Sequence, residues 1–383
     1  MSKRFFSYHN TACKLIASYQ KQMPLQHFLK QYFSENKKHG SKDRKWISHF
    51  CYCFYRLGKS LSNMSIESRL PIAIYLCTDD LAVLGEYLSE KWPRTDSLDE
   101  RIQYVEKEYD FKITDVFPFP DLVVEEIDFV ALNKSFLRQP DVFLRIRPGK
   151  TEKVIRAFES SNMSFEQNGN AVKVKNRTAI EQVVVINKDV VIQDLSSQKI
   201  ATLFPDKGIN SIWDCCAASG GKTLLARDYF PKAKITVSDI RPSILQNHKK
   251  RMQEAGVSVQ KYWTIDLSQP IQDINDLFDL IICDAPCSGS GTWARTPEEM
   301  YFFEKENLKN VSNLQQTIVR HIFGQLKDGG IILYITCSIF KEEDDDVVRE
   351  MAVQCNLTIE KHLIINGLTS GSDSLFGCVL KKS

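Results

Sequence analysis

The sequence lacks the long apolar runs that mark membrane proteins and secreted precursors. None of its apolar stretches approaches the roughly 20 residues that cross a bilayer. Its start, Met1–Ser7, has no apolar stretch of the roughly 7–15 residues found in signal peptides. We therefore expect a cytoplasmic protein without a membrane partner.

Metal-binding patterns are missing too. The eleven cysteines are scattered without a CxxC repeat or a Cys/His pattern, and Cys51 and Cys53 have the wrong spacing for zinc. We expect these two to be buried in a helix, and most of the cysteines to be free thiols in a reducing cytosol. The sequence thus predicts no metal site.

Two nucleotide-binding motifs are incomplete. Gly221-Lys222-Thr223 resembles the end of a phosphate loop, but Cys216 stands where that loop needs its first glycine. The Gly-x-Gly-x-x-Gly fingerprint of dinucleotide enzymes is absent. Both omissions disfavour a nucleotide triphosphatase and a dinucleotide-dependent enzyme.

Acidic residues are scarce near the N-terminus. The net charge of the chain is only +2, yet Glu35 and Asp43 are the only acids between Lys3 and Lys59. Such a local excess of lysine and arginine can attract phosphates, although a solvated helix face would look the same.

Apolar spacing divides the rest of the chain into three parts. The first is helical, with helices expected over 25–33, 47–57, 70–88 and 98–109 and Ser41 as an N-cap. A small α+β unit follows, with helices over 122–133 and 152–161 and strands over 141–147, 171–174 and 182–186. The third alternates helices with strands over 211–214, 234–239, 262–266, 279–284 and 330–336, which predicts a doubly wound, Rossmann-like parallel sheet. We place the three domains at 1–112, 113–190 and 191–383.

A ligand loop is expected after the first strand of that sheet. Residues 214–223 end the strand and open a helix, at the edge where doubly wound sheets bind ligands. Gly220 and Gly221 allow a close backbone approach, and the helix start offers N–H groups to a carboxylate. Acids that can take ribose hydroxyls or an adenine amino group end the next strands, at Asp239, Asp266 and Asp284. These features predict an adenosine-containing cofactor.

Two cysteines stand at the ends of the next strands. Cys287 follows the fourth strand and Cys337 the fifth, and each is followed by serine. Methylation of carbon 5 of a pyrimidine needs such a thiol, because attack on carbon 6 makes carbon 5 nucleophilic. A carboxyl group at the N3 edge would stabilise the adduct, and a base must later remove the proton on carbon 5.

These residues resemble the RsmB/Nop/Sun family of RNA cytosine-5 methyltransferases over nearly the whole chain. The matching segments fall in family order: 192–198, Cys216–Thr223, Asp284-Ala-Pro-Cys-Ser-Gly-Ser-Gly, Leu314-Gln315, Thr336-Cys-Ser-Ile with Glu342-Glu343, and Asp373-Ser-Leu-Phe376. DNA cytosine-5 enzymes use the cysteine of the Pro-Cys loop as nucleophile, so the presence of Thr336-Cys337 favours the RNA class.

The resemblance implies a role for each site residue. Cys337 would be the nucleophile, Cys287 would serve adduct breakdown and release, and Asp284 would contact the cytosine edge or the cofactor's sulfonium end. The residues implied to hold S-adenosylmethionine are Cys216, Ala217, Ala218, Ser219, Gly220, Gly221, Lys222, Asp239, Asp266 and Asp284.

The first two domains also have counterparts in the family. Lys42-Asp-Arg44, leading into the helix that ends at Arg56-Leu57-Gly58, resembles the NusB-like helical domain of RsmB-type members, whose basic early helices meet RNA. Phe143–Arg147 resembles a strand of the family's small RNA-recognition-like domain. The family thus implies an RNA partner, and we expect a monomer.

Five residues depart from the family pattern: Ser219 stands for proline, Ile244 for arginine, Arg147 and Asp344 for asparagine, and Ser374 for glycine. None removes a catalytic group, and the polar interaction of the family's arginine at position 244 is either absent or supplied by Arg241. The leading hypothesis is a methyltransferase of 16S ribosomal RNA. The alternatives are a transfer-RNA enzyme and a non-catalytic RNA-binding or assembly factor. A small-molecule methyltransferase would explain neither the paired cysteines nor the added domains.

Overall fold

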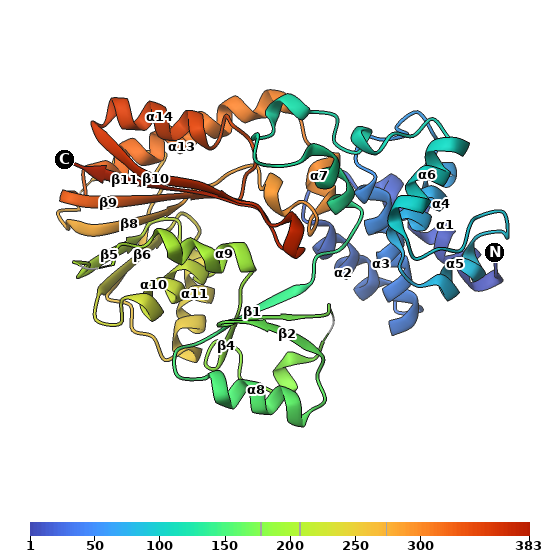
Figure 1. Cartoon of the computed structure of the whole chain (residues 1–383), viewed down its shortest axis with the longest axis horizontal. Coiled ribbons are helices and arrows are strands. Elements are labelled where there is room, and N and C mark those ends of the chain that lie inside the picture. The colour runs from blue at the N-terminus through green and yellow to red at the C-terminus, as the bar shows by residue number, and fades with distance from the viewer. Residues whose placement is uncertain (177, 207, 273) are drawn as a thin grey trace. The chain divides into compact units, whose positions relative to one another are not determined.

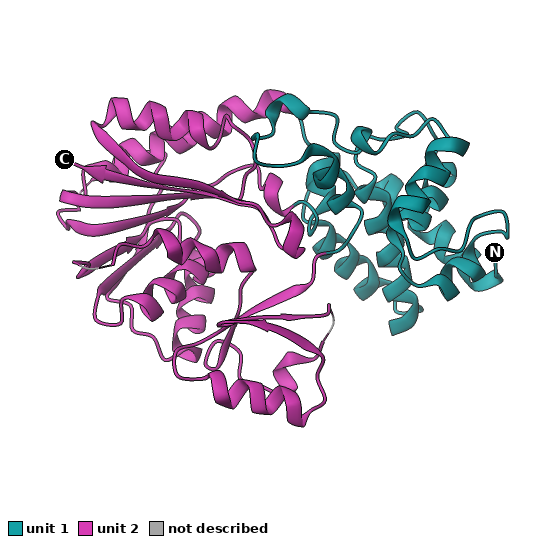
Figure 2. Cartoon of the chain, in the orientation of Figure 1, with its two compact units in different colours: residues 1–139, 293–304 teal, residues 140–292, 305–383 magenta. Residues whose placement is uncertain are grey.

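A computed structural model describes residues 1–176, 178–206, 208–272 and 274–383. The chain forms two compact units (Figure 2): unit 1 comprises Met1–Gln139 and Trp293–Glu304, and unit 2 comprises Pro140–Thr292 and Lys305–Ser383. This division groups the small α+β segment with the large sheet. The three-domain division at residues 112 and 190 stays a prediction.

Unit 1 is helical, as the sequence predicts. Its helices are α1 (Lys3–Ser18), α2 (Leu25–Glu35), α3 (Ser41–Arg56), α4 (Ile66–Cys77), α5 (Leu81–Tyr87), α6 (Leu98–Glu108), α7 (Phe129–Phe136) and α12 (Pro297–Tyr301). Cys51 and Cys53 are buried on α3, as predicted.

Three helix predictions in unit 1 are wrong in detail. A single helix over 70–88 does not form, because Thr78 ends α4 and the Asp80 carboxylate accepts a hydrogen bond from Val83 N to start α5. Gly40, not Ser41, is the N-cap of α3. The helix expected over 122–133 begins only after Asp128, whose carboxylate caps α7 by accepting from Ala131 N.

The segment Trp293–Glu304 is an integral part of unit 1. The carboxylate of Glu298 on α12 accepts a hydrogen bond from Leu25 N at the start of α2, at 3.1 Å. The Tyr301 ring meets the Tyr55 ring of α3 at a centroid distance of 5.2 Å. Unit 1 is therefore built from two separate stretches of the chain.

A small antiparallel sheet opens unit 2. It has the order β2-β3-β1-β4 and carries the helix α8 (Thr151–Ser160). Its strands are β1 (Val142–Ile146), β2 (Phe165–Asn168), β3 (Ala171–Val174) and β4 (Val190–Ile192). The strand expected over 182–186 is wrong: a 3-10 turn covers Ile180–Gln182, and the left-handed residue Asn187 turns the chain so that Val190–Ile192 pairs with β1 instead.

The larger sheet is doubly wound (Figure 1). Its strands are β5 (Ser211–Asp214), β6 (Lys234–Asp239), β7 (Lys261–Thr264), β8 (Phe278–Asp284), β9 (Leu326–Thr336), β10 (Leu357–Ile365) and β11 (Leu375–Lys382), in the order β10-β11-β9-β8-β5-β6-β7. Strand β11 runs antiparallel to both of its neighbours, β10 and β9. The helices α13 (Leu308–Phe323) and α14 (Asp345–Gln354) cover one face, and α9 (Leu195–Lys199), α10 (Gly221–Tyr229) and α11 (Pro242–Glu254) lie on the other.

This topology fixes where a ligand can bind. Strand β5 pairs with β6 on one side and with β8 on the other, so the strand order reverses beside β5. Doubly wound sheets bind ligands at that reversal, beyond the carboxyl ends of the strands.

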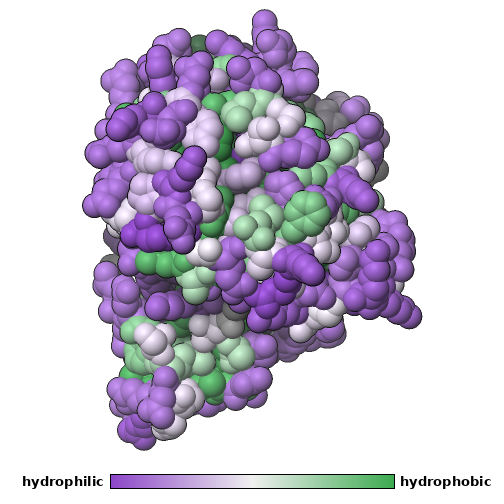
Figure 3. All heavy atoms as spheres, turned by 90° about the vertical axis from the view of Figure 1, so that its right-hand side faces the viewer, coloured by the Kyte–Doolittle hydropathy of each residue, from purple (hydrophilic) through white to green (hydrophobic). Residues whose placement is uncertain are grey.

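Charged and polar residues cover most of the face drawn in Figure 3, and apolar residues form separate patches among them. Across the described parts of the chain, no helix is both long and apolar enough to span a bilayer.

Candidate active site

The loop between β5 and α10 forms the floor of the site. Gly220 is the N-cap of α10 and has a φ of 88°, a conformation that favours glycine. A Cβ at this position would come within 2.8 Å of the His248 ring and 2.7 Å of the Met252 methyl group, both on α11. Glycine is thus required both by the backbone and by the close approach of α11, and the start of α10 stays open to a ligand.

Asp239 is fixed at the end of β6. Its carboxylate accepts from Ala218 N (3.1 Å) and from both sides of the Arg241 guanidinium (2.9 and 3.1 Å). Burial alone would raise the pKa of Asp239, but these hydrogen bonds and the arginine's charge bring it below its usual value. Arg241 N also donates to Oδ1 (3.0 Å), so each carboxylate oxygen already accepts two hydrogen bonds, and a ligand hydroxyl would have to replace one of the arginine's donors.

Lys222 and Asp284 join two of the predicted segments. The Lys222 ammonium group on α10 lies 3.1 Å from the Asp284 carboxylate at the end of β8. Lys222 is buried, whereas the Asp284 side chain is about one-third exposed (32%) and so still faces the site. Asp266 stays apart from this pair: it is exposed beyond β7 and accepts a hydrogen bond from Ser268 N in its own turn.

The two predicted cysteines meet. Cys287 Sγ and Cys337 Sγ, at the ends of the adjacent strands β8 and β9, are 3.3 Å apart, and both residues are half-buried. The hydrogen bond to Cys337, together with burial, raises the pKa of the Cys287 thiol well above its usual value, and the charge of Glu343 adds to this effect. At this position the Cys287 thiol therefore favours its protonated form.

Sequence reasoning missed several residues that support the loops. The buried carboxylate of Glu343 accepts hydrogen bonds from Ser288 and Ser338, the residues that follow the two cysteines. Arg251 Nη1 on α11 donates to the carbonyl and hydroxyl oxygens of Ser219 (3.0 and 3.2 Å). Glu343 lies in a matched family segment, but its contacts depend on the folded chain.

A buried polar chain runs beneath the cofactor loop. The Thr223 hydroxyl lies 2.5 Å from the Asp214 carboxyl group and 2.9 Å from His248 Nε2, and all three side chains are fully buried. Burial raises the pKa of Asp214 to about 7 and lowers the pKa of His248 to about 4.

All eleven cysteines are free thiols. Besides the pair described above, Cys215, Cys216 and Cys283 gather at the ends of β5 and β8. Hydrogen bonds with the Cys215 and Cys283 thiols lower the pKa of Cys216 to about 5. Among the described residues, no group of three or more metal-ligating side chains has the geometry to hold an ion.

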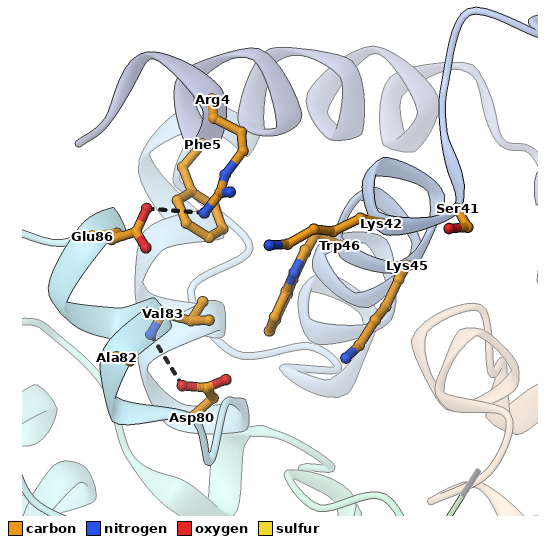
Figure 4. Close-up of a pocket in the computed structure, with 10 residues that line it drawn as sticks. All are labelled: Arg4, Phe5, Ser41, Lys42, Lys45, Trp46, Asp80, Ala82, Val83 and Glu86. Carbon is orange, nitrogen blue, oxygen red and sulfur yellow. Dashed lines mark hydrogen bonds and ion pairs between the residues drawn. The ribbon is translucent and has the colours of Figure 1, made fainter.

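Unit 1 carries a basic pocket of about 590 Å³ between α1, α3 and α5 (Figure 4). Lys42 and Lys45 extend along it from α3. Its two acids are already engaged: Glu86 pairs with Arg4 at 3.0 Å, and Asp80 caps α5. The lysines therefore leave the pocket with a positive character that suits phosphate groups.

The strand order, the glycine loop after β5 and the strand-end acids define the catalytic domain of S-adenosylmethionine-dependent methyltransferases. Residues 200–369 match a family model described as 16S rRNA methyltransferase RsmB/F. This part of the chain is therefore similar to that family.

Curated relatives show the same similarity. The chain is 29% identical over 220 residues to "Ribosomal RNA small subunit methyltransferase B" of Pasteurella multocida, covering 54% of this chain and 48% of the relative. It is 30% identical over 200 residues to the "Probable ribosomal RNA small subunit methyltransferase B" of Bacillus subtilis, covering 50% and 45%. The chain thus spans about half the length of these relatives.

Solved structures share the fold. The structure of PH0851 matches with a TM-score of 0.72 at 18% identity, over 100% of this chain and 99% of that one. NSun6 from Pyrococcus horikoshii, solved with the S-adenosylmethionine analogue SFG, matches with a TM-score of 0.59 at 14% identity, over 69% of this chain and 96% of that one. These matches show that the chain shares the fold of both structures.

Proposed function

We propose that this chain methylates carbon 5 of a cytosine in RNA, with 16S ribosomal RNA as the substrate. The observation that carries the proposal is the contact between Cys287 Sγ and Cys337 Sγ, 3.3 Å apart at the strand ends beside the cofactor loop. Methylation of a purine, or of an oxygen atom, needs no thiol pair. The names of the curated relatives support ribosomal RNA as the substrate class.

The residues present fit S-adenosylmethionine. Gly220 opens the backbone at the start of α10, and the exposed Asp266 is available to an adenine amino group. The Asp239 carboxylate is held at the end of β6, where ribose hydroxyls would replace donors of the exposed Arg241. We assign the segment Cys216–Lys222 to the remainder of the cofactor site. When bound, the cofactor supplies a methyl group activated by a sulfonium.

Cys337 begins the reaction in this scheme. Its thiolate forms a bond to carbon 6 of the cytosine, which makes carbon 5 nucleophilic. Asp284, held by Lys222, contacts the N3 edge and stabilises the adduct. After methyl transfer, carbon 5 carries both the methyl group and its original proton. A base removes that proton, the double bond between carbons 5 and 6 re-forms, and the bond from Cys337 to carbon 6 breaks.

Cys287 serves this last stage. Before the adduct forms, its proton is held by the hydrogen bond to Cys337. Once Cys337 is bonded to carbon 6, the hydrogen bond between the two thiols that raised the pKa of Cys287 is lost. Cys287 then loses its proton more readily and acts in adduct breakdown.

Substitution of each cysteine tests these roles. Cys337→Ala should abolish methyl transfer and any covalent RNA adduct, because it removes the sulfur that bonds to carbon 6 in this scheme. Cys287→Ala should accumulate an adduct that survives denaturation. Incubation with RNA transcripts and labelled S-adenosylmethionine, followed by denaturing electrophoresis, separates the outcomes. Turnover by Cys337→Ala would refute the nucleophile assignment, and normal release by Cys287→Ala would refute the release role.

Bisulfite sequencing tests the substrate. RNA from cells with and without the gene should differ at a cytosine of 16S ribosomal RNA. A difference confined to transfer RNA would overturn the ribosomal assignment, and no difference at any cytosine would overturn the enzymatic proposal.

A further inference from the structure

The loop that carries Cys287 and the loop that carries Cys337 both donate hydrogen bonds to the carboxylate of Glu343. Ser288, which follows Cys287, donates to Glu343 through its N–H (2.7 Å to Oε1) and through its hydroxyl (2.5 Å to Oε2). Ser338, which follows Cys337, donates its hydroxyl to Glu343 Oε2 at 2.6 Å. Glu343 is completely buried, so these contacts form away from water.

Neighbouring groups fix the glutamate in turn. Gln315 Nε2 donates to Pro286 O (3.0 Å) and, at 3.4 Å, to Glu343 Oε1. The Tyr334 hydroxyl on β9 donates to Glu343 O at 2.8 Å. The carboxylate, its backbone and the residue before Cys287 are thus held by one set of side chains.

A second bridge links the loops without the glutamate. The Ser290 and Ser338 hydroxyl oxygens are 3.1 Å apart, and Ser290 Oγ accepts from Ile339 N at 2.9 Å. The loops would therefore stay near each other without Glu343. What the carboxylate adds is a fixed position for the two residues immediately beside the reactive sulfurs.

The physical chemistry of this arrangement is demanding. A buried carboxylate is costly unless several donors satisfy it, and hydrogen bonds to a charged acceptor are shorter and stronger than neutral ones. Glu343 receives four such donors, from Ser288 N, Ser288 Oγ, Ser338 Oγ and Gln315 Nε2. A small displacement of either loop would lengthen and weaken some of these hydrogen bonds. The two loops therefore have one preferred spacing.

We propose that Glu343 is a positioning residue that holds Cys287 and Cys337 at hydrogen-bond distance through the serine that follows each of them. It positions the two sulfurs through Ser288 and Ser338. Its charge has a second effect, because it helps to raise the pKa of the Cys287 thiol and so keeps the proton on that sulfur. The catalytic meaning of the spacing rests on the proposed function, but the spacing itself does not.

We call the hydrogen bonds from Ser288 and Ser338 to Glu343 the clamp. Glu343→Gln tests the clamp with a side chain of the same size. The amide oxygen can replace Oε2 and accept from both serine hydroxyls, but the amide nitrogen at the Oε1 position cannot accept from Ser288 N. One charge-assisted hydrogen bond to the loop of Cys287 is therefore removed. We expect methyl transfer to slow by about 10- to 100-fold, the effect of removing one such buried hydrogen bond, with unchanged affinity for S-adenosylmethionine. Glu342→Gln, the same change at the half-buried neighbouring residue, should leave both quantities unchanged.

A second readout needs no RNA. Iodoacetamide labelling, resolved by mass spectrometry for each cysteine as a function of pH, reports ionisation of the thiols. In Glu343→Gln, labelling of Cys287 should begin at lower pH, because the charge that helped to keep it protonated is gone. Glu343→Asp keeps the charge but not the reach: it should retain the wild-type labelling profile while transferring methyl groups slowly.

These outcomes separate the two proposals. If wild-type protein methylates no RNA while the labelling profiles shift as described, the proposed function fails and the clamp stands. If Glu343→Gln matches wild type in rate and in labelling, or if Glu342→Gln is impaired equally, the clamp is refuted. Should Glu343→Gln fail to fold, Ser288→Ala and Ser338→Ala decide: slower transfer with intact cofactor binding supports the clamp, and wild-type rates in both refute it.

Discussion

At the scale of single residues, the side chains that depart from the family pattern have partners of their own. Arg241 pairs with Asp239 at 2.9 Å, an interaction that the sequence suggested when Ile244 took the place of arginine. The Ser374 hydroxyl accepts from Gly367 N at 3.0 Å. Burial raises the pKa of Asp344 well above its usual value, so this carboxyl group keeps its proton and offers one donor and one acceptor, as an asparagine would.

The buried chain from Asp214 through Thr223 to His248 makes stability depend on pH in two opposite ways. His248 has a pKa of about 4, below the usual value for histidine, so its contribution is present above about pH 6.5 and is lost as the pH falls toward 4. Asp214 has a pKa of about 7, above the usual value for aspartate, so its contribution is present below about pH 4 and is lost as the pH rises through 7. Between these limits the two effects offset each other.

Single variants should separate the pH dependence of the unfolding free energy that each of the two residues contributes. His248→Gln leaves Asp214 alone, and its free energy of unfolding should rise relative to wild type as the pH falls from 6.5 to 4.5. Asp214→Asn leaves His248 alone and should show the opposite trend, each slope reaching about 1.4 kcal/mol per pH unit at most. Urea denaturation across this range measures both. Parallel pH profiles for the two variants would contradict the assignment.

At the scale of elements, helix α11 braces the cofactor loop. Arg251 donates to Ser219 in that loop, and its Nε donates to Asn187 Oδ1 at 2.9 Å in the turn before β4. Asn187 is thereby linked to the same arginine that steadies the loop. The hydrogen bonds of Arg251 thus do part of the stiffening that a proline at position 219 would provide.

Arg251→Met should therefore weaken cofactor binding. We expect the Kd for S-adenosylmethionine, measured by calorimetry, to rise about 10-fold for the removal of a charge-assisted hydrogen bond. Adding Ser219→Pro should recover part of this affinity, because proline restricts the loop before binding. Lys250→Met, at the exposed neighbouring position, is the matched control. Equal Kd values for Arg251→Met and wild type would show that the hydrogen bonds from Arg251 to Ser219 are not needed for cofactor binding.

The strands near the site were largely predictable from the sequence. The predicted bounds of β5 and β6 are confirmed, because each is a short apolar run that ends at an aspartate. The contact of Cys287 with Cys337 follows from their positions at the ends of adjacent strands. Glu343 was not predictable as a clamp, since its partner Ser288 lies 55 positions away and serine–glutamate pairing has no periodic signature.

At the scale of the whole molecule, the basic pocket of unit 1 gives the charge pattern of the first helices a location. Lys42 and Lys45 point along it, and Lys45 Nζ lies 5.2 Å from the centroid of the Trp46 ring. As sequence features, these lysines were indistinguishable from a solvated helix face. The fold distinguishes them because the acids beside them are paired or act as caps. A NusB-like identity for this unit stays a prediction.

Charge reversal tests whether the pocket meets RNA. Lys42→Glu combined with Lys45→Glu should weaken RNA binding and lower the salt dependence of log Kd by up to about 2, since each phosphate contact contributes about 0.7–0.9. Affinity for S-adenosylmethionine should not change. Lys107→Glu with Lys112→Glu makes the same charge change at exposed positions elsewhere in unit 1. Equal weakening in both double variants would mean that net charge, not the pocket, attracts RNA.

The second stretch of unit 1 has a consequence for dissecting the gene. Residues 1–139 encode every long helix of that unit, yet a fragment that stops there leaves Leu25 N without the Glu298 carboxylate and Phe117 without the Trp293 ring. Its counterpart, residues 140–383, would carry Trp293–Glu304 with no helices to receive it. Neither half is a complete module, so fusions, deletions and domain exchanges at residue 139 would break a shared core.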